Sequence, residues 1–274
     1  MALVTRPVKR ALRSRFGWLP LYELRNKLLF GHTALPVWRF ESAEVRRLAA
    51  MLPGPRETLV TTVIPTYRRP RELGEAVRSA LAQTVRDHTV IVVDDGAGLP
   101  DDLPADERLI AVSLSRNTGV LGVVRNVGIR LARSEFVAFL DDDNTWEPDH
   151  LETALRALRA GESGARRLDA VYTAMRRVYP DGRERDVLSV PYDRARARNH
   201  AFLDANPFVA RRSRSLRFSR MRRDRGVLPR EDWASLYRYG RRHRIEHVPH
   251  PTVRYLVNVD TYYTVWDDDA VGQS

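Results

Sequence analysis

After residue 57 the chain alternates between short apolar runs and stretches in which apolar residues recur every three or four positions. Four runs rich in Val, Ile and Phe predict buried strands at residues 58–65, 89–96, 108–115 and 135–143. The intervening segments 69–84 and 119–134 have helical periodicity. Strands that alternate with helices in this way predict an α/β fold with a mostly parallel, Rossmann-like sheet flanked by helices.

The beginning of the chain has a different pattern. Residues 1–56 contain helical patches at 19–30 and 42–52, and the sequence LPGPRE at 52–57 then interrupts the periodicity with two prolines and a glycine. We therefore predict a helical N-terminal extension over residues 1–56 that packs on the main domain. The alternative for this segment is a peripheral contact with a membrane through its basic residues.

Beyond residue 150 helices and strands are mixed. The pattern predicts a helix at 149–162, two strands around a Pro-Asp-Gly turn within 168–190, a helix at 228–243 and a final pair of short strands within 245–257. The main domain is therefore predicted to have two halves, 57–150 and a smaller mixed half at 151–260, followed by a C-terminal tail at 261–274.

Polar residues follow three of the predicted parallel strands. Pro65-Thr66-Tyr67, Asp94-Asp95 and Asp141-Asp142-Asp143 stand at the carboxyl ends of their strands, where open α/β sheets bind ligands. Three adjacent carboxylates repel one another, which predicts a strongly positive ligand; the alternative is a solvated turn that starts the next helix. In an extended segment, Asp141 and Asp143 would point to one side and Asp142 to the other.

Composition narrows the classes of function. The chain has no cysteine, which excludes disulfides and thiolate metal sites and suits a reducing cytoplasm. No apolar run has the roughly 20 residues that span a bilayer. The net charge of +11 comes from arginines spread along the chain, since lysine occurs only at Lys9 and Lys27. We therefore expect no nucleic acid as the main partner, whereas attraction to acidic substrates or lipid head groups fits the charge.

Four motifs occur in order: TTVIPTYRRPRELGEAVRSALAQT at 61–84, VIVVDDG at 90–96, SRNTGVLGVVRNVGIRLARSEFVAFLDDDN at 115–144 and REDWASLYRYG at 230–240. In this order and spacing the chain resembles the family 2 glycosyltransferases, over roughly residues 58–258. The resemblance implies the GT-A fold and transfer, with inversion, of a sugar from a nucleotide-diphosphate donor, a UDP-sugar being favoured, to a hydroxyl-bearing acceptor. It also implies Mg²⁺ or Mn²⁺, for which carboxylates are natural ligands.

The resemblance assigns donor-side roles. Asp143 is implied to contact the metal, with Asp141 and Asp142 serving the metal shell, the ribose or the sugar. Of Asp94 and Asp95, Asp95 is favoured to bind the imide of uracil. The residues implied to line the base, ribose or diphosphate are Pro65, Thr66, Tyr67 and Arg125. Tyr67 is alternatively an ordinary half-buried aromatic, and Arg125 a salt-bridge partner on the helix surface.

The acceptor half, 151–260, is implied to carry the catalytic base. Asp232 is the candidate base and Glu231 a neighbour that orients the acceptor or a loop, the alternative being two acids that stabilise a helix N-terminus. The sequence departs from the family where many relatives carry a late metal-binding histidine, because Asn258 stands there. His247 or His250 is the candidate substitute.

The sequence leaves two rival functions open. A nucleotidyltransferase also uses strand-end acids and a metal, but its first strand is usually followed by a glycine-rich loop, and this chain has no glycine there before Gly74. A catalytically silent nucleotide-sugar-binding protein would be expected to lack the acids, which are all present. The donor sugar and the acceptor are not specified by the sequence.

Overall fold

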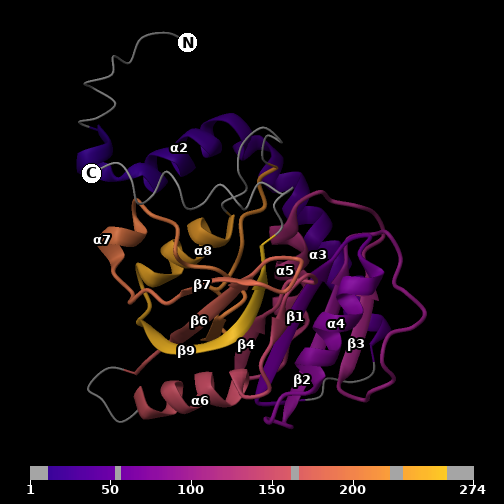
Figure 1. Cartoon of the computed structure of the whole chain (residues 1–274). Helices are drawn as coiled ribbons and strands as arrows, with labels where there is room; N and C mark the ends of the chain where they lie inside the picture. Colours follow the sequence, from indigo (N-terminus) through magenta and orange to yellow (C-terminus); the bar gives the residue numbers. More distant parts are fainter. Residues whose placement is uncertain (1–11, 53–56, 162–166, 223–230, 258–274) are drawn as a thin grey trace.

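The computed structural model describes residues 12–52, 57–161, 167–222 and 231–257. Within these residues nine strands form one sheet in the order β3-β2-β1-β4-β8-β6-β9-β5, with β7 paired to β6 (Figure 1). The first four strands in this order are parallel: β1 (Val60–Thr66), β2 (His88–Asp94), β3 (Leu109–Ser113) and β4 (Phe136–Phe139). The four parallel strands predicted from the apolar runs are confirmed.

Helices cover both faces of the sheet. On one face, α4 (Pro70–Leu81) and α6 (His150–Ala160) pack against side chains such as Ile64 and Val92. On the other face, α5 (Leu121–Leu131) packs against Val93, and α8 (Glu231–Gly240) lies beyond it over the second half of the sheet. Successive residues of each strand face opposite layers, so both faces are apolar, as a doubly covered sheet requires.

The second half of the sheet is mixed. It contains β8 (Phe208–Arg211), β6 (Ala170–Val178), β7 (Glu184–Leu188), β9 (Ile245–Leu256) and β5 (Thr145–Trp146), with the short helix α7 (Arg194–Ala197) preceding β8. The predicted pair β6–β7 is confirmed. The predicted final pair of short strands is wrong: residues 245–256 form one strand. Its pairing with β6 slips around Pro249 and Pro251, whose missing N–H groups shift the register without ending the strand.

The N-terminal extension is helical, as predicted, with α2 (Trp18–Phe30), the 3₁₀ turn η1 (Gly31–Thr33) and α3 (Ala34–Met51). It packs on the main domain. The Leu48 side chain joins the core formed by α5 and β2, and Trp18 stacks on Trp233 with ring centroids 5.5 Å apart. No helix of the described residues is long and apolar enough to cross a membrane.

A close backbone approach brings the end of β2 to the loop that precedes α5. Gly96 has φ 75°, and a Cβ atom there would lie 2.3 Å from the carbonyl carbon of Arg116. Only glycine permits both the conformation and the contact. Asp95 thereby reaches Thr118.

Candidate active site

A cavity of about 540 Å³ opens at the carboxyl ends of β1, β2 and β4. The three polar strand ends of the sequence therefore meet in one place. Residues from the start of α5, from the segment before β8 and from the start of α8 complete the wall. The lining residues are Pro65, Thr66, Tyr67, Arg69, Asp95, Asn117, Gly119, Val120, Leu121, Val124, Arg125, Asp141, Asp142, Asp143, Asn144, Asp204, Glu231, Asp232 and Tyr255.

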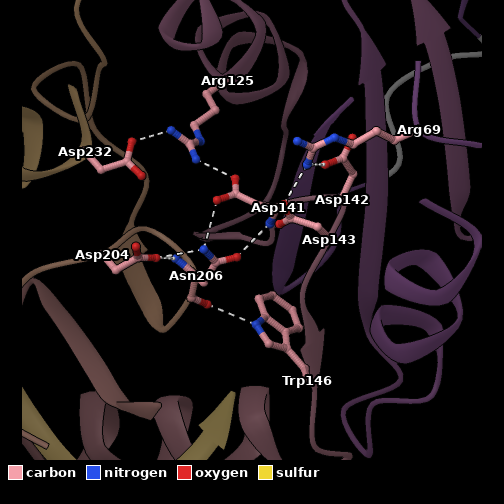
Figure 2. Close-up of polar contacts among 9 residues, drawn as sticks. All are labelled: Arg69, Arg125, Asp141, Asp142, Asp143, Trp146, Asp204, Asn206 and Asp232. Atoms are coloured by element: carbon pink, nitrogen blue, oxygen red, sulfur yellow. Dashed lines mark hydrogen bonds and ion pairs between the residues drawn. The ribbon is translucent and has the colours of Figure 1, made fainter. Parts of the chain in front are cut away.

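The three consecutive acids divide between two arginines (Figure 2). Asp141 binds Arg125, whereas Asp142 and Asp143 bind the same Arg69 nitrogen at 3.2 and 2.6 Å. The expected alternation, with Asp141 and Asp143 on one side, is wrong. The strand ends at Phe139, and residues 141–144 turn, with the Asn144 N–H donating to the Asp141 carbonyl.

Arg125 is fully buried and joins the two halves of the site. Its guanidinium donates to Asp141 and to Asp232 (Figure 2). The guanidinium also lies over the Phe218 ring, 5.0 Å from the ring centre. The alternative of a salt bridge on the helix surface is therefore wrong. Burial disfavours the charge, yet Asp141 and Asp232 raise the pKa of Arg125, so the guanidinium is permanently charged.

Asp204 and Asn206 belong to the site, and sequence reasoning missed them. Asn206 accepts a hydrogen bond from the Asp141 N–H at 2.7 Å and donates to the carboxylates of Asp141 and Asp204 at 2.9 and 2.7 Å. One oxygen each from Asp141, Asp204 and Asp232 lie within 4.8 Å of one another, a spacing that a cation can bridge. Asp143 is not a member of this triad.

The two acids after β2 have different surroundings. Asp94 is buried and accepts from the N–H groups of Ala97 and Gly98 and from the Ser113 hydroxyl, and it does not line the cavity. Asp95 lines the cavity and accepts from Thr118 and Gly119. Burial raises the pKa of Asp95. Asp94 thus stabilises a turn, while Asp95 faces the ligand space.

The residues after β1 line the same wall. Thr66 donates to Asp142 at 2.8 Å. The Tyr67 side chain is exposed and borders the cavity, and the Arg68 guanidinium lies 5.1 Å from the centre of its ring. Tyr67 is therefore placed where a ring can stack on a planar ligand. Pro65 also borders the cavity, at the end of β1.

Glu231 and Asp232 form the first turn of α8. Asp232 binds Arg125, and its neighbour Trp233 is fixed by donating to the Ala197 carbonyl at 2.6 Å. Glu231 is buried, and its Oε2 has no hydrogen-bond partner among the described residues. Burial raises the pKa of Asp232 well above its usual range despite Arg125, and Glu231 and Asp141 reinforce that shift.

Negative charge dominates the cavity. Its lining contains seven carboxyl groups and two guanidinium groups, those of Arg69 and Arg125. Burial raises the pKa of Asp142 to about 7 and that of Asp204 to about 6. It also raises the pKa of Asp143, where Asp141 adds like-charge repulsion. This excess of oxygen donors fits a hard divalent cation.

The histidines considered as substitute metal ligands lie elsewhere. His247 contacts the Ser189 hydroxyl at 3.3 Å and His250 contacts Asp149 at 3.1 Å. Neither lines the cavity. Asn258 lies outside the described residues.

Known proteins share both the sequence pattern and the fold. The sequence model of Glycosyl transferase family 2 matches residues 61–219 of the 274. The succinoglycan biosynthesis protein ExoW of Rhizobium meliloti is 39% identical over 107 residues, covering 36% of this chain and 34% of that protein. The chondroitin synthase of Escherichia coli is 31% identical over 150 residues, covering 53% of this chain and 20% of that protein. The match thus spans about a third or less of the length of these curated relatives.

A solved structure supports the fold. The crystal structure of Staphylococcus aureus TarS 1–349 in complex with UDP-GlcNAc superimposes with a TM-score of 0.57 at 18% identity, covering 76% of this chain and 61% of that chain. The α/β fold of the GT-A type expected from the sequence is confirmed. Because the family match extends over more than half of the sequence and contains the strand-end acids, the chain belongs to glycosyl transferase family 2.

Proposed function

We propose that the protein is a metal-dependent, inverting glycosyltransferase that moves a sugar from a UDP-sugar to a hydroxyl-bearing acceptor. The observation that carries the proposal is the meeting of the strand-end acids with Asp232 of α8 in one cavity. The complex of TarS with UDP-GlcNAc supports a UDP-sugar donor for a protein of this fold. The acceptor is a glycan, a lipid-linked saccharide or a small molecule.

The base and ribose of the donor would lie between the ends of β1 and β2. Asp95 would accept a hydrogen bond from the uracil imide, and Tyr67 would stack on the ring. Asp95 is already oriented by Thr118 and Gly119, so its carboxylate needs no rearrangement to bind. Asp142 is held by Thr66 beside this space and would bind the ribose or the sugar.

The carboxylate oxygens of the cavity fit a divalent cation. Asp143 and Asp141 would hold Mg²⁺ or Mn²⁺, and Arg69 would move from Asp143 toward the diphosphate, which carries its own negative charge. The ion supplies charge stabilisation for the departing nucleotide diphosphate. The triad of Asp141, Asp204 and Asp232 is a poorer site, because Arg125 already neutralises two of its members.

Asp232 would take the proton of the acceptor hydroxyl as its oxygen attacks the anomeric carbon. A raised pKa makes a carboxylate a stronger base, and burial raises that of Asp232. Arg125 fixes the orientation of the carboxylate and links it to the acid turn after β4. Glu231 would orient the acceptor or the loop before α8.

Peripheral membrane contact is proposed for the N-terminal helices. Eight of the ten exposed large hydrophobic side chains of the described residues lie between residues 12 and 51, Leu28 being 78% exposed. Arg25, Lys27 and Arg39 stand exposed among them. An apolar surface with basic residues fits the anionic lipids at the cytoplasmic face of a membrane.

Thermal unfolding with a series of nucleotide-sugars, each with and without Mn²⁺, tests the main proposal. We expect a UDP-sugar to raise the melting temperature only when the metal is present. Stabilisation by no nucleotide-sugar under either condition would refute a donor site in this cavity.

A further inference from the structure

A second cavity, of about 510 Å³, lies on the other flank of α5 from the active site. It is bordered by Val45 of α3, by residues of α5 and by the segment that follows β8. Its lining residues are Val45, Asn126, Ile129, Arg130, Arg212, Ser213, Arg214, Leu216, Arg217 and Arg220. None of them lines the active-site cavity. We call this cavity the arginine pocket.

The arginine pocket carries five guanidinium groups and no lining acid among the described residues. Glu41, which is fully buried behind it, pairs with Arg220 at 2.6 Å and with Arg130 at 3.2 Å. The Arg212 Nε donates to the Ser134 carbonyl. The side chains of Arg214 and Arg217 are exposed and have no acidic partner within the described part of the chain.

Five positive groups around one cavity repel one another, and one buried carboxylate compensates only part of that charge. Glu41 also holds two of the guanidinium groups in place, because both of its oxygens accept from Arg220 and one of them also accepts from Arg130. Planar guanidinium groups that are already oriented match the oxygens of a phosphate group with two parallel hydrogen bonds. The volume lies within the range of pockets that hold small ligands.

We propose that the arginine pocket binds a phosphate-bearing ligand that is separate from the sugar donor. The phosphate belongs either to a small soluble molecule or to the head group of an acidic phospholipid. Arg214 and Arg217 supply the exposed contacts, and Arg130 and Arg220 form the fixed floor.

One short segment connects the arginine pocket to Arg125 of the active site. Phe218, between Arg217 and Ser219, exchanges hydrogen bonds with Asn126, and its ring lies against Arg125. A ligand that orders this segment would therefore also order the wall behind Arg125.

The test compares the parent protein with the double variant Arg214→Ala, Arg217→Ala. Its control is Arg86→Ala, Arg159→Ala, which removes the same charge from exposed arginines that do not line the pocket. Calorimetry would use two probes, inorganic pyrophosphate and monomeric short-chain phosphatidylglycerol, without divalent metal so that the acidic cavity does not retain them. Metal-dependent stabilisation by the UDP-sugar, measured on the same samples, reports on the active site independently.

We expect the double variant to bind at least one probe tenfold or more weakly than the parent and the control, with the donor response unchanged. Loss of pyrophosphate binding alone identifies a soluble phosphate ligand, and loss of phosphatidylglycerol binding alone identifies the lipid head group. If neither probe binds the parent, or if the double variant binds both as the control does, the arginine pocket is not a phosphate site, whatever the donor experiment gives.

Discussion

Asp232 forms an ion pair with the buried Arg125 and is also the candidate base, so one carboxylate has both a structural and a proposed catalytic role. Asn keeps the oxygen that accepts from Arg125 but cannot take up a proton. We expect Asp232→Asn to bind donor and metal nearly as the parent does, while transfer falls by roughly 10²–10⁴-fold. Steady-state transfer rates and donor affinity by calorimetry measure both quantities. Glu231→Gln is the matched control and should lose less transfer activity. Full transfer activity in Asp232→Asn would leave Glu231 as the candidate base.

Asp143 differs from its neighbour Asp141 in its partner, since it binds the half-exposed Arg69 and not the buried Arg125. Removing its carboxylate should therefore leave the core intact. We expect Asp143→Ala to lose the metal-dependent part of UDP binding, measured by calorimetry with and without Mn²⁺, and to keep the melting temperature of the parent. Asp181→Ala removes an exposed acid in the turn between β6 and β7 and should change neither. UDP binding that still responds to Mn²⁺ in Asp143→Ala would exclude this residue as a ligand.

Asp95 tests the identity of the base. Asp95→Asn keeps one oxygen, which can still accept from the Thr118 N–H, but replaces the oxygen that accepts from the Gly119 N–H with a donor. A donor at this place also clashes with the imide N–H of uracil. We expect UDP to bind more weakly by roughly tenfold or more, since an unpaired buried polar group costs about 1–3 kcal/mol. The affinity for nucleotides with other bases should fall less. An equal loss for UDP, GDP and ADP would make Asp95 a structural residue.

At the scale of elements, the sequence predicts those strands and helices that have a clear apolar periodicity. The parallel strands and their covering helices follow from apolar runs, so the meeting of Thr66, Asp95 and Asp141 was predictable. Asp204 was not, because it lies in an irregular segment before β8, and its link to Asp141 through Asn206 spans 65 residues. The alternation rule failed at the acids because it applies only within a strand, and β4 had already ended at Phe139.

The helices α2 and α3 carry the next prediction. Replacing Leu24 and Leu28 by serine removes two exposed apolar side chains that make no core contact. Each is expected to contribute roughly 1–2 kcal/mol to insertion at a bilayer interface, so binding to phosphatidylglycerol vesicles should fall tenfold or more. Co-sedimentation measures it. Val187→Ser, an exposed apolar residue of β7, is the control, and an unchanged vesicle affinity in the leucine variant would argue against this surface.

At the scale of the whole molecule, the sign of the net charge does not indicate the charge of the individual sites. The chain carries a net charge of +11, yet the cavity between its halves is strongly acidic, and a separate pocket beside α5 is strongly basic. The net charge therefore predicts neither site. The acids of the cavity also affect stability, because in metal-free protein their mutual repulsion favours unfolding as they ionise.

Buried histidines oppose this effect. His150 lies between Trp146 and Thr252, and burial lowers its pKa to about 3. Below pH 6.5 the unfolded chain therefore binds a proton at this residue, whereas the folded chain does not. Stability from His150 is thus lost as the pH falls from 6.5 toward 3, by at most 1.4 kcal/mol per pH unit. Asp142, with a pKa of about 7 in the fold, acts in the opposite direction: the folded chain takes up a proton as the pH falls through 7 that the unfolded chain takes up only near pH 4.

The contributions of His150 and Asp142 to the free energy of unfolding should nearly cancel each other between pH 7 and pH 5 in the metal-free parent, and single variants should separate them. We expect His150→Gln to gain stability on acidification from pH 7 to pH 5, and Asp142→Asn to lose it, each by up to about 2 kcal/mol relative to the parent. Urea unfolding in EDTA at the two pH values measures these changes. His200→Gln, an exposed histidine, should follow the parent. If His150→Gln also follows the parent, then His150 already binds its proton in the folded state, and the interior around α6 is more open to water than its burial implies.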